Sequence, residues 1–301
     1  MSYIKKELKL TNLKAFALLM KEFNISMREA QRLIDKRRLF CNDELVLKKN
    51  EFLQGKVELL CYENNPKGVD IVFENDDFAV LEKESGILSH PNGRKCSYSL
   101  CDEIWHLWGK QACVAHRLDK QTSGLILVAK HKKSQIEFKS MFEKKEIKKE
   151  YLALVYGYTN DEFVLDDSLS LNEDYEDVKT RVVLDKNGKK SISYFKKIDF
   201  FKDLNASFLL CKPLTGRQHQ LRAHLFYNGH RILGDCLYGL EKDDIEKILD
   251  GLCDEKEYFR LCLAKRLCLH SNRLSFVYKE KKYDIFSKKD TKSEFLNSCK
   301  F

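Results

Sequence analysis

A polar loop between two apolar segments is the feature that most constrains the fold of this chain. Residues 112–115 predict a short strand and residues 125–130 a second one, because both are apolar and end at polar residues. The loop between them, residues 116–124, reads HRLDKQTSG and concentrates charged, hydroxyl and imidazole side chains. Functional side chains are often carried by loops that a rigid sheet holds in place. We therefore expect a sheet that presents this loop.

Strand and helix patterns along the rest of the chain predict an α+β fold. Residues 69–74 and 78–83 are apolar and flank an Asn-Asp-Asp turn at 75–77, which predicts a β-hairpin. Residues 151–156 are apolar throughout, as in a strand that is buried on both faces. Residues 134–144 have a helical composition. We predict a catalytic domain with a mixed, largely antiparallel sheet, flanking helices and a central cleft.

A boundary between two domains is predicted near residue 65. The segment 62–68 reads YENNPKG, and turn residues of this kind are typical of a linker. We assign residues 1–65 to a small α/β domain and residues 66–301 to the catalytic domain.

A stripe of basic residues marks the small domain. Arg28, Arg32 and Lys36 recur every four residues, so they share one face of a helix. Ser26 and Glu29 have the spacing of a capping box, which predicts that the helix begins there. The chain carries a formal net charge of +8, and five basic residues face only two acidic ones between positions 28 and 38. The stripe is either a solvated helix face or a surface for phosphate groups.

Composition excludes several classes of protein. Aromatic residues make up 11% of the chain, which excludes low-complexity disorder. The longest aliphatic run, residues 125–129, is far shorter than the roughly 20 residues of a membrane span, and no apolar segment near the N-terminus suggests a secretory signal. The eleven cysteines form no Cys-x-x-Cys pair, so we expect reduced thiols in a cytoplasmic protein.

Two further segments carry definite expectations. Residues 160–178 contain eight acidic residues and no Lys or Arg, which predicts a solvated acidic loop away from any nucleic acid. Thr215 and Gln218 have capping-box spacing, so a helix is expected from 215 to about 228, with Gly229 as its C-terminal stop. Arg217 would then lie near a helix N-terminus, where anions are favoured.

The polar loop resembles the signature His-Arg-Leu-Asp-x-x-Thr-Ser-Gly of the RluA-type pseudouridine synthases, and all seven fixed positions match. Residues 1–65 resemble, more loosely, the small RNA-binding module first known from a small-subunit ribosomal protein. Further blocks that resemble the family follow in order at residues 149–157, 213–224, 232–238 and 267–274.

The resemblance implies an enzyme that isomerises uridine to pseudouridine in structured RNA. It implies that Asp119 is the nucleophile or electrostatic partner at the reacting carbon, that Arg217 pairs with Asp119, and that Tyr151 stacks on the uracil. It further implies that Arg117 fills the gap left by the extruded base, that Leu221 lines the pocket, and that His116 contributes to substrate binding. In this interpretation Arg28, Arg32 and Lys36 contact RNA phosphates.

Several alternatives stay open from the sequence. The resemblance requires no cofactor and no metal, and His116, His219 and His224 lack a Cys or carboxylate that would complete a metal site. The expected partner is structured RNA, with large-subunit ribosomal RNA favoured over tRNA. We expect the protein to be a monomer that binds neither DNA nor a membrane. A nucleosidase-like hydrolase using Asp119, and an RNA-binding assembly factor with an unused site, are the rival functions.

Overall fold

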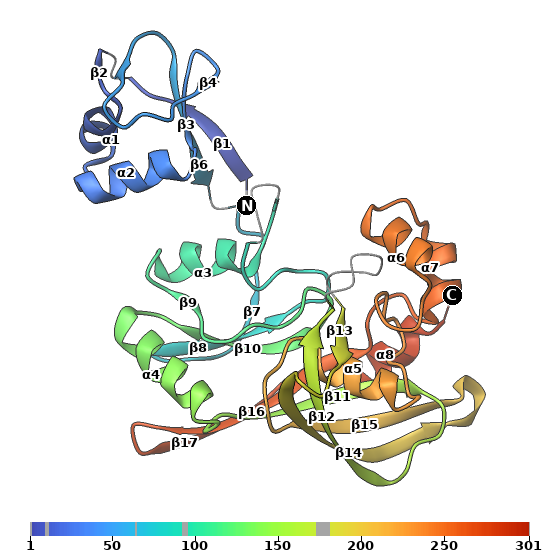
Figure 1. Cartoon of the computed structure of the whole chain (residues 1–301). Coiled ribbons are helices and arrows are strands. Elements are labelled where there is room, and N and C mark those ends of the chain that lie inside the picture. The colour runs from blue at the N-terminus through green and yellow to red at the C-terminus, as the bar shows by residue number, and fades with distance from the viewer. Residues whose placement is uncertain (1, 10–11, 64, 92–95, 173–180, 301) are drawn as a thin grey trace. The chain divides into compact units, whose positions relative to one another are not determined.

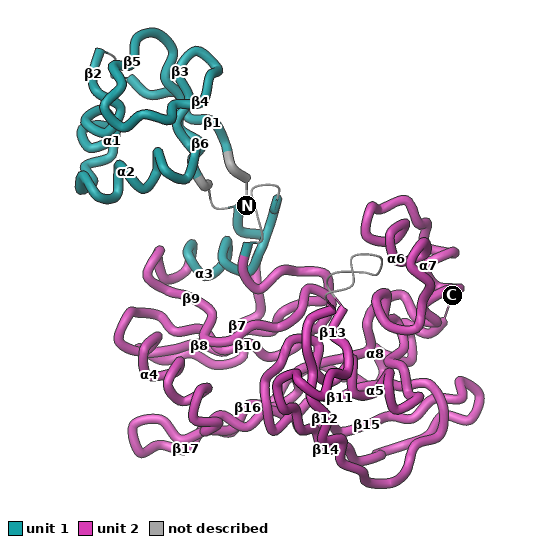
Figure 2. Tube along the Cα trace, viewed as in Figure 1, with its two compact units in different colours: residues 1–67, 91–106 teal, residues 68–90, 107–301 magenta. Residues whose placement is uncertain are grey.

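The computed structural model describes residues 2–9, 12–63, 65–91, 96–172 and 181–300. The chain forms two compact units, residues 1–67 with 91–106 and residues 68–90 with 107–301 (Figure 2). Residues 91–106, which the sequence assigns to the catalytic domain, thus belong to the first unit. There, the backbone N–H of Asn65 donates to Asp102 (3.1 Å) and that of Lys67 donates to Glu103 (2.6 Å).

The first unit packs two helices against small antiparallel sheets. Its core consists of aliphatic side chains such as Leu18, Leu19, Ile34 and Leu39, all at most 1% exposed. The main sheet has the order β1-β6-β3-β4, and β2 pairs with β5. The elements are β1 (Ser2–Glu7), β2 (Leu13–Lys14), α1 (Ala15–Phe23), α2 (Met27–Asp35), β3 (Leu39–Cys41), β4 (Glu44–Leu45), β5 (Phe52–Leu53) and β6 (Val57–Glu63), with α3 (Leu100–Trp108) ending in the second unit.

Helix α2 confirms the predicted capping box. The Ser26 hydroxyl accepts from the Glu29 N–H at 3.3 Å, and the Glu29 carboxylate accepts from the Ser26 N–H at 3.0 Å. Arg28 and Arg32 are exposed on this helix, and Lys36 is its exposed C-cap residue. The predicted basic stripe therefore lies on the surface of the first unit.

The second unit is built on one sheet of eleven strands (Figure 1). The strands follow the order β13-β12-β14-β15-β11-β16-β10-β8-β7, with β17 beside β16 and β9 beside β10. Among the described strands only β10 and β16 pair in parallel, so the predicted mixed, largely antiparallel α+β fold is confirmed. The strands are β7 (Asp70–Glu74), β8 (Phe78–Lys83), β9 (Cys113–Val114), β10 (Ser123–Ala129), β11 (Lys148–Tyr156), β12 (Glu162–Leu171), β13 (Val182–Leu184), β14 (Lys189–Phe201), β15 (Ala206–Pro213), β16 (Leu269–Tyr278) and β17 (Lys281–Phe286).

Helices flank this sheet: α4 (Lys132–Glu143), α5 (Gln220–Tyr227), α6 (Lys242–Leu249), α7 (Glu255–Cys262) and α8 (Thr291–Ser298), with a short 3-10 helix at Lys202–Leu204. An aromatic cluster under α4 forms one core of the unit. The Phe78 ring lies 5.3 Å from Phe138, 5.6 Å from Phe276 and 5.0 Å from Tyr283, between ring centroids. Every residue of β10 is buried, so the strand that follows the polar loop is rigidly placed. No helix in the described part of the chain is long and apolar enough to cross a membrane.

The predicted acidic loop at 160–178 is wrong over residues 162–171, which form strand β12. Lysines of β14 and nearby residues neutralise its acidic side chains: Lys196 pairs with Glu162 at 2.8 Å and Lys190 with Asp166 at 3.3 Å. Cross-strand pairing of opposite charges of this kind stabilises a sheet. Residues 173–178 of that segment lie outside the described residues.

The helix predicted from residue 215 begins later, at Gln220. His219, the residue before it, has a left-handed backbone (φ 50°), so residues 215–219 form a loop instead of a first turn. The predicted end is confirmed, because Gly229 follows the helix with φ 80° and its N–H donates to the carbonyl of Phe226 at 3.0 Å.

Gly124 provides a test of the parallel pairing between β10 and β16. Its φ is +105°, and a Cβ there would lie 2.3 Å from the carbonyl oxygen of Ser271. We expect Gly124→Ala to lower the free energy of unfolding by more than about 3 kcal/mol, because the clash is with backbone that cannot move alone. The matched control is Gly229→Ala, which has a similar φ but open space around it and should cost about 1 kcal/mol. Urea denaturation of both variants measures this, and equal losses would contradict the expectation.

Candidate active site

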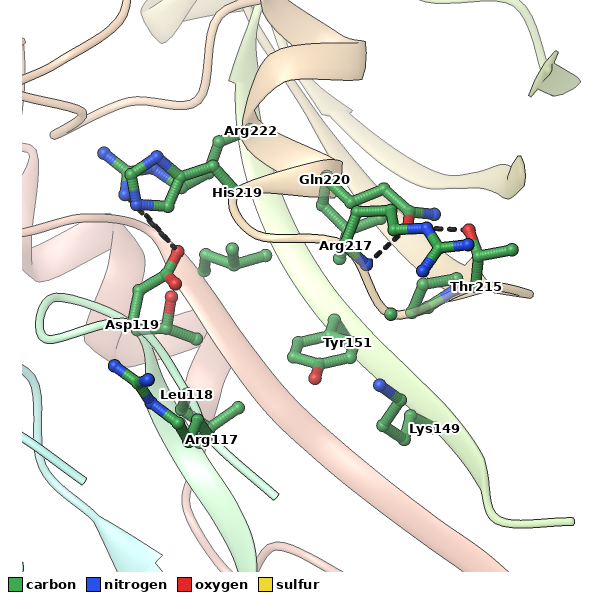
Figure 3. Close-up of a pocket in the computed structure, with 15 residues that line it drawn as sticks. Arg117, Leu118, Asp119, Lys149, Tyr151, Thr215, Arg217, His219, Gln220 and Arg222 are labelled. Atoms are coloured by element: carbon green, nitrogen blue, oxygen red, sulfur yellow. Dashed lines mark hydrogen bonds and ion pairs between the residues drawn. The ribbon is translucent and has the colours of Figure 1, made fainter. Parts of the chain in front are cut away.

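A solvent-open cavity lies in the second unit. The loop after β9, strand β11, the loop before α5 and the first residue of β16 form its walls (Figure 3). Its lining comprises Arg117, Leu118, Asp119, Thr122, Lys149, Tyr151, Pro213, Thr215, Gly216, Arg217, His219, Gln220, Leu221, Arg222 and Leu269. The structure thus brings together five residues predicted from the sequence: Arg117, Asp119, Tyr151, Arg217 and Leu221.

A buried lysine fixes the loop that carries Asp119. Lys83 is 0% exposed, and its ammonium donates to the carbonyl oxygens of Ile87 (2.8 Å), Glu84 (2.9 Å) and Lys120 (3.1 Å). Burial lowers the pKa of Lys83 to about 7, although the negative charge of Asp119 opposes that shift. Three carbonyl acceptors match the three N–H groups of the ammonium form. The Lys83 side chain therefore fixes the backbone directly after Asp119.

Hydroxyl groups fasten the same loop at two other points. Ser85 donates to the carbonyl of Gln121 at 2.6 Å. Ser89 donates to the carbonyl of Leu118 at 2.8 Å and accepts from its N–H at 3.1 Å. These bonds satisfy backbone groups of a loop that has no ladder partner of its own. These bonds therefore fix the backbone on both sides of Asp119.

Arg222 is the arginine that pairs with Asp119, and the predicted Arg217 pair is wrong. One Nη atom of Arg222 lies 3.4 Å from an Asp119 carboxylate oxygen. The other two nitrogens donate to Asp235, both at 2.7 Å, in a bidentate pair. Arg222 is 3% exposed and Asp235 1%. Burial alone would lower the pKa of Arg222, but attraction and hydrogen bonding from Asp235, together with attraction to Asp119, raise it.

Asp235 is itself fixed by the chain that follows it. Its carboxylate accepts from the N–H groups of Leu237 (2.9 Å) and Tyr238 (3.1 Å). Burial would raise the pKa of Asp235, but the charge of Arg222 and these hydrogen bonds lower it, so the carboxylate stays ionised.

Arg217 is displaced because the loop before α5 folds back on Gln220. The Gln220 side-chain oxygen accepts from the hydroxyl of Thr215 (2.7 Å) and from the N–H of Arg217 (3.0 Å). The Arg217 guanidinium donates through Nε to the carbonyl of Lys190 at 3.3 Å. Arg217 still lines the cavity, away from Asp119 (Figure 3). Sequence reasoning missed Arg222, although it lies in the same block of residues, because the resemblance assigned the pairing role to Arg217.

Tyr151 stands on β11 beside a register shift between β11 and β16, an irregularity that is common next to active sites. Its side chain is 7% exposed and lines the cavity. Burial and the negative charge of Asp119 raise the pKa of Tyr151, so the phenol keeps its proton. The ring therefore offers an aromatic face with a protonated hydroxyl near the carboxylate.

His116 is the predicted site residue that the structure does not bring to the cavity lining. Its Nε2 accepts from the backbone N–H of Leu127 at 3.1 Å, and its ring packs on Phe142 at 4.9 Å. Burial, with repulsion from Lys149, lowers the pKa of His116 to about 3. The imidazole is neutral and ties the start of the polar loop to β10.

A second histidine lies beside the carboxylate. His219 Nε2 is 3.8 Å from an Asp119 oxygen, and Nδ1 is 3.3 Å from the Tyr238 hydroxyl. Burial lowers the pKa of His219 in spite of the attraction of Asp119, so the ring is neutral near pH 7. In the part of the chain that the structure describes, no group of three His, Cys, Asp or Glu side chains is arranged to hold a metal.

A network of polar side chains, mostly buried, lies next to the loop that carries Asp119. Arg266 donates to the hydroxyl of Ser123 at 3.0 Å, and that hydroxyl lies 2.9 Å from His270 Nδ1. His270 Nε2 lies 3.4 Å from Glu82 and 3.0 Å from the hydroxyl of Ser287. Burial lowers the pKa of His270 to about 3 and raises that of Glu82 to about 7. The network connects the first residue of β10 with β16 and β8 through mostly neutral groups.

Comparison with known proteins matches this chain to one family. The model of the family described as RNA pseudouridylate synthase matches residues 77–226. A protein of Helicobacter pylori named an uncharacterized RNA pseudouridine synthase is 36% identical over 91% of this chain and 91% of its own length. The ribosomal large subunit pseudouridine synthase D of Zymomonas mobilis is 29% identical over 71% of this chain and 67% of its own.

Solved structures agree on the fold. The structure titled human RNA pseudouridylate synthase domain containing 1 has a TM-score of 0.59 at 21% identity, covering 76% of this chain and 86% of that one. The chain belongs to the RNA pseudouridine synthase family, as the RluA-type signature predicted, and is therefore an isomerase.

The buried Glu82 predicts how stability depends on pH. The pKa of this carboxyl is about 7 in the folded protein and near 4.5 when unfolded, so its stabilising contribution is present at pH 4.5 and lost as pH rises through 7. Glu82→Gln cannot ionise, so its stability relative to the parent protein should improve by up to about 3 kcal/mol between pH 5 and pH 8.

Urea denaturation at pH 5, 6.5 and 8 measures this difference. Glu146→Gln, at an exposed glutamate, is the matched control and should show no trend. A constant difference between Glu82→Gln and the parent across this range would contradict the prediction.

Proposed function

We propose that this protein isomerises a specific uridine to pseudouridine in a structured RNA, with large-subunit ribosomal RNA as the favoured target. The observation that carries the proposal is the Asp119 carboxylate, held in a solvent-open cavity by buried Arg222 and facing the aromatic ring of Tyr151. The family assignment and the name of the Zymomonas relative support the reaction and the favoured target.

The reaction explains why a single carboxylate is the central group. The bond between uracil N1 and ribose C1′ breaks, a bond between uracil C5 and C1′ forms, C5 releases its proton and N1 gains one. Nothing is oxidised or reduced, so the balance requires no cofactor. An ionised Asp119 can attack C1′ or uracil C6, or take a proton from the sugar. Arg222 pairs with that carboxylate at 3.4 Å and orients it.

The remaining lining residues suit a nucleobase that has left its stack. Tyr151 supplies a face for stacking, and Leu118, Leu221 and Leu269 give the cavity apolar walls. A detached uracil must be retained and shielded from water, or the reaction would end as base loss. Arg117 is exposed and lines the cavity, and it is proposed to enter the space that the extruded base leaves in the RNA.

The first unit is proposed to contribute phosphate contacts through Arg28, Arg32 and Lys36. All three side chains are exposed. Slight desolvation and repulsion from Arg32 and Arg38 lower the pKa of the exposed Lys36, and the repulsion reflects a local concentration of positive charge. Such a patch attracts a polyanion.

The proposed location of the protein is the cytoplasm. Its eleven cysteines are free thiols, as expected in a reducing compartment. The protein is proposed to act as a monomer.

Asp119→Asn should abolish turnover while RNA affinity changes less than about twofold, because the amide cannot supply the anionic oxygen. The measurement is tritium release from RNA labelled at uracil C5, taken from cells that lack the gene, beside a binding titration with the same RNA. Normal release by the variant would remove Asp119 from the mechanism. Free uracil in the products would favour a hydrolase. If the parent protein binds the RNA but releases no tritium, an RNA-binding assembly factor is favoured. If the RNA that releases tritium is tRNA, then tRNA replaces large-subunit ribosomal RNA as the proposed target.

The basic stripe is tested by the salt dependence of binding. Changing Arg28, Arg32 and Lys36 together to Gln should weaken RNA binding and reduce the slope of log K against log salt by about 2, because roughly three phosphate contacts are lost. The matched control changes the exposed Lys242, Lys247 and Lys256 of the second unit to Gln. Equal slopes for the two triple variants would return the stripe to a solvated helix face.

A further inference from the structure

Lys149 is a basic residue in the cavity lining for which the described residues provide no partner. Its side chain projects from β11 into the cavity on the same face as Tyr151, two residues away (Figure 3). No described residue accepts a hydrogen bond from its ammonium or forms an ion pair with it. The neighbouring carboxylate, Glu150, is engaged by Arg273 and Lys212, each at 3.1 Å. Burial lowers the pKa of Lys149, so this position costs the protein free energy unless an anion is supplied.

A second set of open donors lies beside Lys149 in the loop before α5. A Cβ on Gly216 would lie 3.6 Å from the Lys149 nitrogen, so this backbone faces the ammonium directly. The N–H of Gly216 and the two terminal nitrogens of Arg217 have no acceptor among the described residues. Figure 3 shows Arg217 and Lys149 on one side of Tyr151 and Asp119 with Arg222 on the other.

The charges of the cavity do not balance within the protein. Arg222 is neutralised by Asp235 and Asp119, the two carboxylates in contact with it. Lys149 and Arg217 remain, with no carboxylate within ion-pair distance among the described residues. A neutral uracil carbonyl could accept a hydrogen bond from either side chain, but it would leave both charges uncompensated. A phosphate group supplies the negative charge and several acceptor oxygens together.

We propose that Lys149, Arg217 and the Gly216 N–H bind a backbone phosphate that flanks the target uridine. The site rests on the proposed function and names the part of the RNA that it recognises. Its use follows from the chemistry: once the N1–C1′ bond is broken, the base no longer holds the ribose in the cavity. A phosphate clamp would keep C1′ opposite Asp119 while the uracil turns.

The first test compares two lysines of the same strand. Lys149→Met should raise the RNA concentration that half-saturates tritium release by about tenfold, equivalent to one good charged contact. Lys148→Met, which removes an exposed lysine one residue away, should leave it within twofold. Lys149→Arg keeps the charge and should restore most of the loss. Thermal melting of each variant establishes that it is folded.

The second test asks whether the recognised group is a phosphate. Uridine 3′,5′-bisphosphate and uridine are compared as inhibitors of tritium release. The parent protein should be inhibited at least about tenfold better by the bisphosphate, and Lys149→Met should lose that preference. The 3′- and 5′-monophosphates then identify which phosphate is bound.

The outcomes separate this inference from the proposed function. If the parent protein releases no tritium, the proposed reaction is wrong. If it does, and Lys149→Met behaves like Lys148→Met, the phosphate site is overturned while the reaction stands. If Lys149→Met loses activity but keeps the preference for bisphosphate, Lys149 contacts another part of the substrate, and the phosphate site is again rejected.

Discussion

The candidate active site depends on the guanidinium of Arg222, which contacts both Asp235 and Asp119. Two nitrogens of Arg222 donate to Asp235 and the third contacts Asp119. The buried Asp235 therefore fixes the guanidinium that orients the half-buried Asp119 carboxylate. Removing either partner would leave a charge without compensation inside the protein, which is far more costly than losing a surface pair. Helix α5 and the chain after Asp235 must therefore dock before the carboxylate in the cavity is properly oriented.

The sequence was most informative where structure is decided locally. The hairpin at 69–83, the capping box of α2 and the Gly229 stop depend on residues a few positions apart, and all were predicted. The Asp119 loop was recognised through seven matching positions of a signature. Strands at 125–130 and 151–156 were likewise predicted from their apolar residues, although burial of the second on both faces is wrong at Tyr156, which is 47% exposed.

The failures arose where a distant partner decides. Arg217 and Arg222 lie five residues apart, and only the left-handed backbone of His219 with the folded-back side chain of Gln220 determines which one reaches Asp119. Strand β12 looked like an acidic loop because the lysines that neutralise it lie on another strand. The sequence analysis assigned no role to Lys149, because the side chains that surround it can be identified only from the structure.

The parallel contact of β10 with β16 has a consequence for the life of the protein in the cell. Ser123 and His270 are 147 residues apart, yet they are hydrogen-bonded next to the cavity, whose wall includes Leu269. A growing polypeptide emerges in order from the ribosome, so the chain that carries Asp119 is released long before its wall exists. The wall of the cavity that Leu269 provides therefore cannot form beside Asp119 until residue 269 has been synthesised.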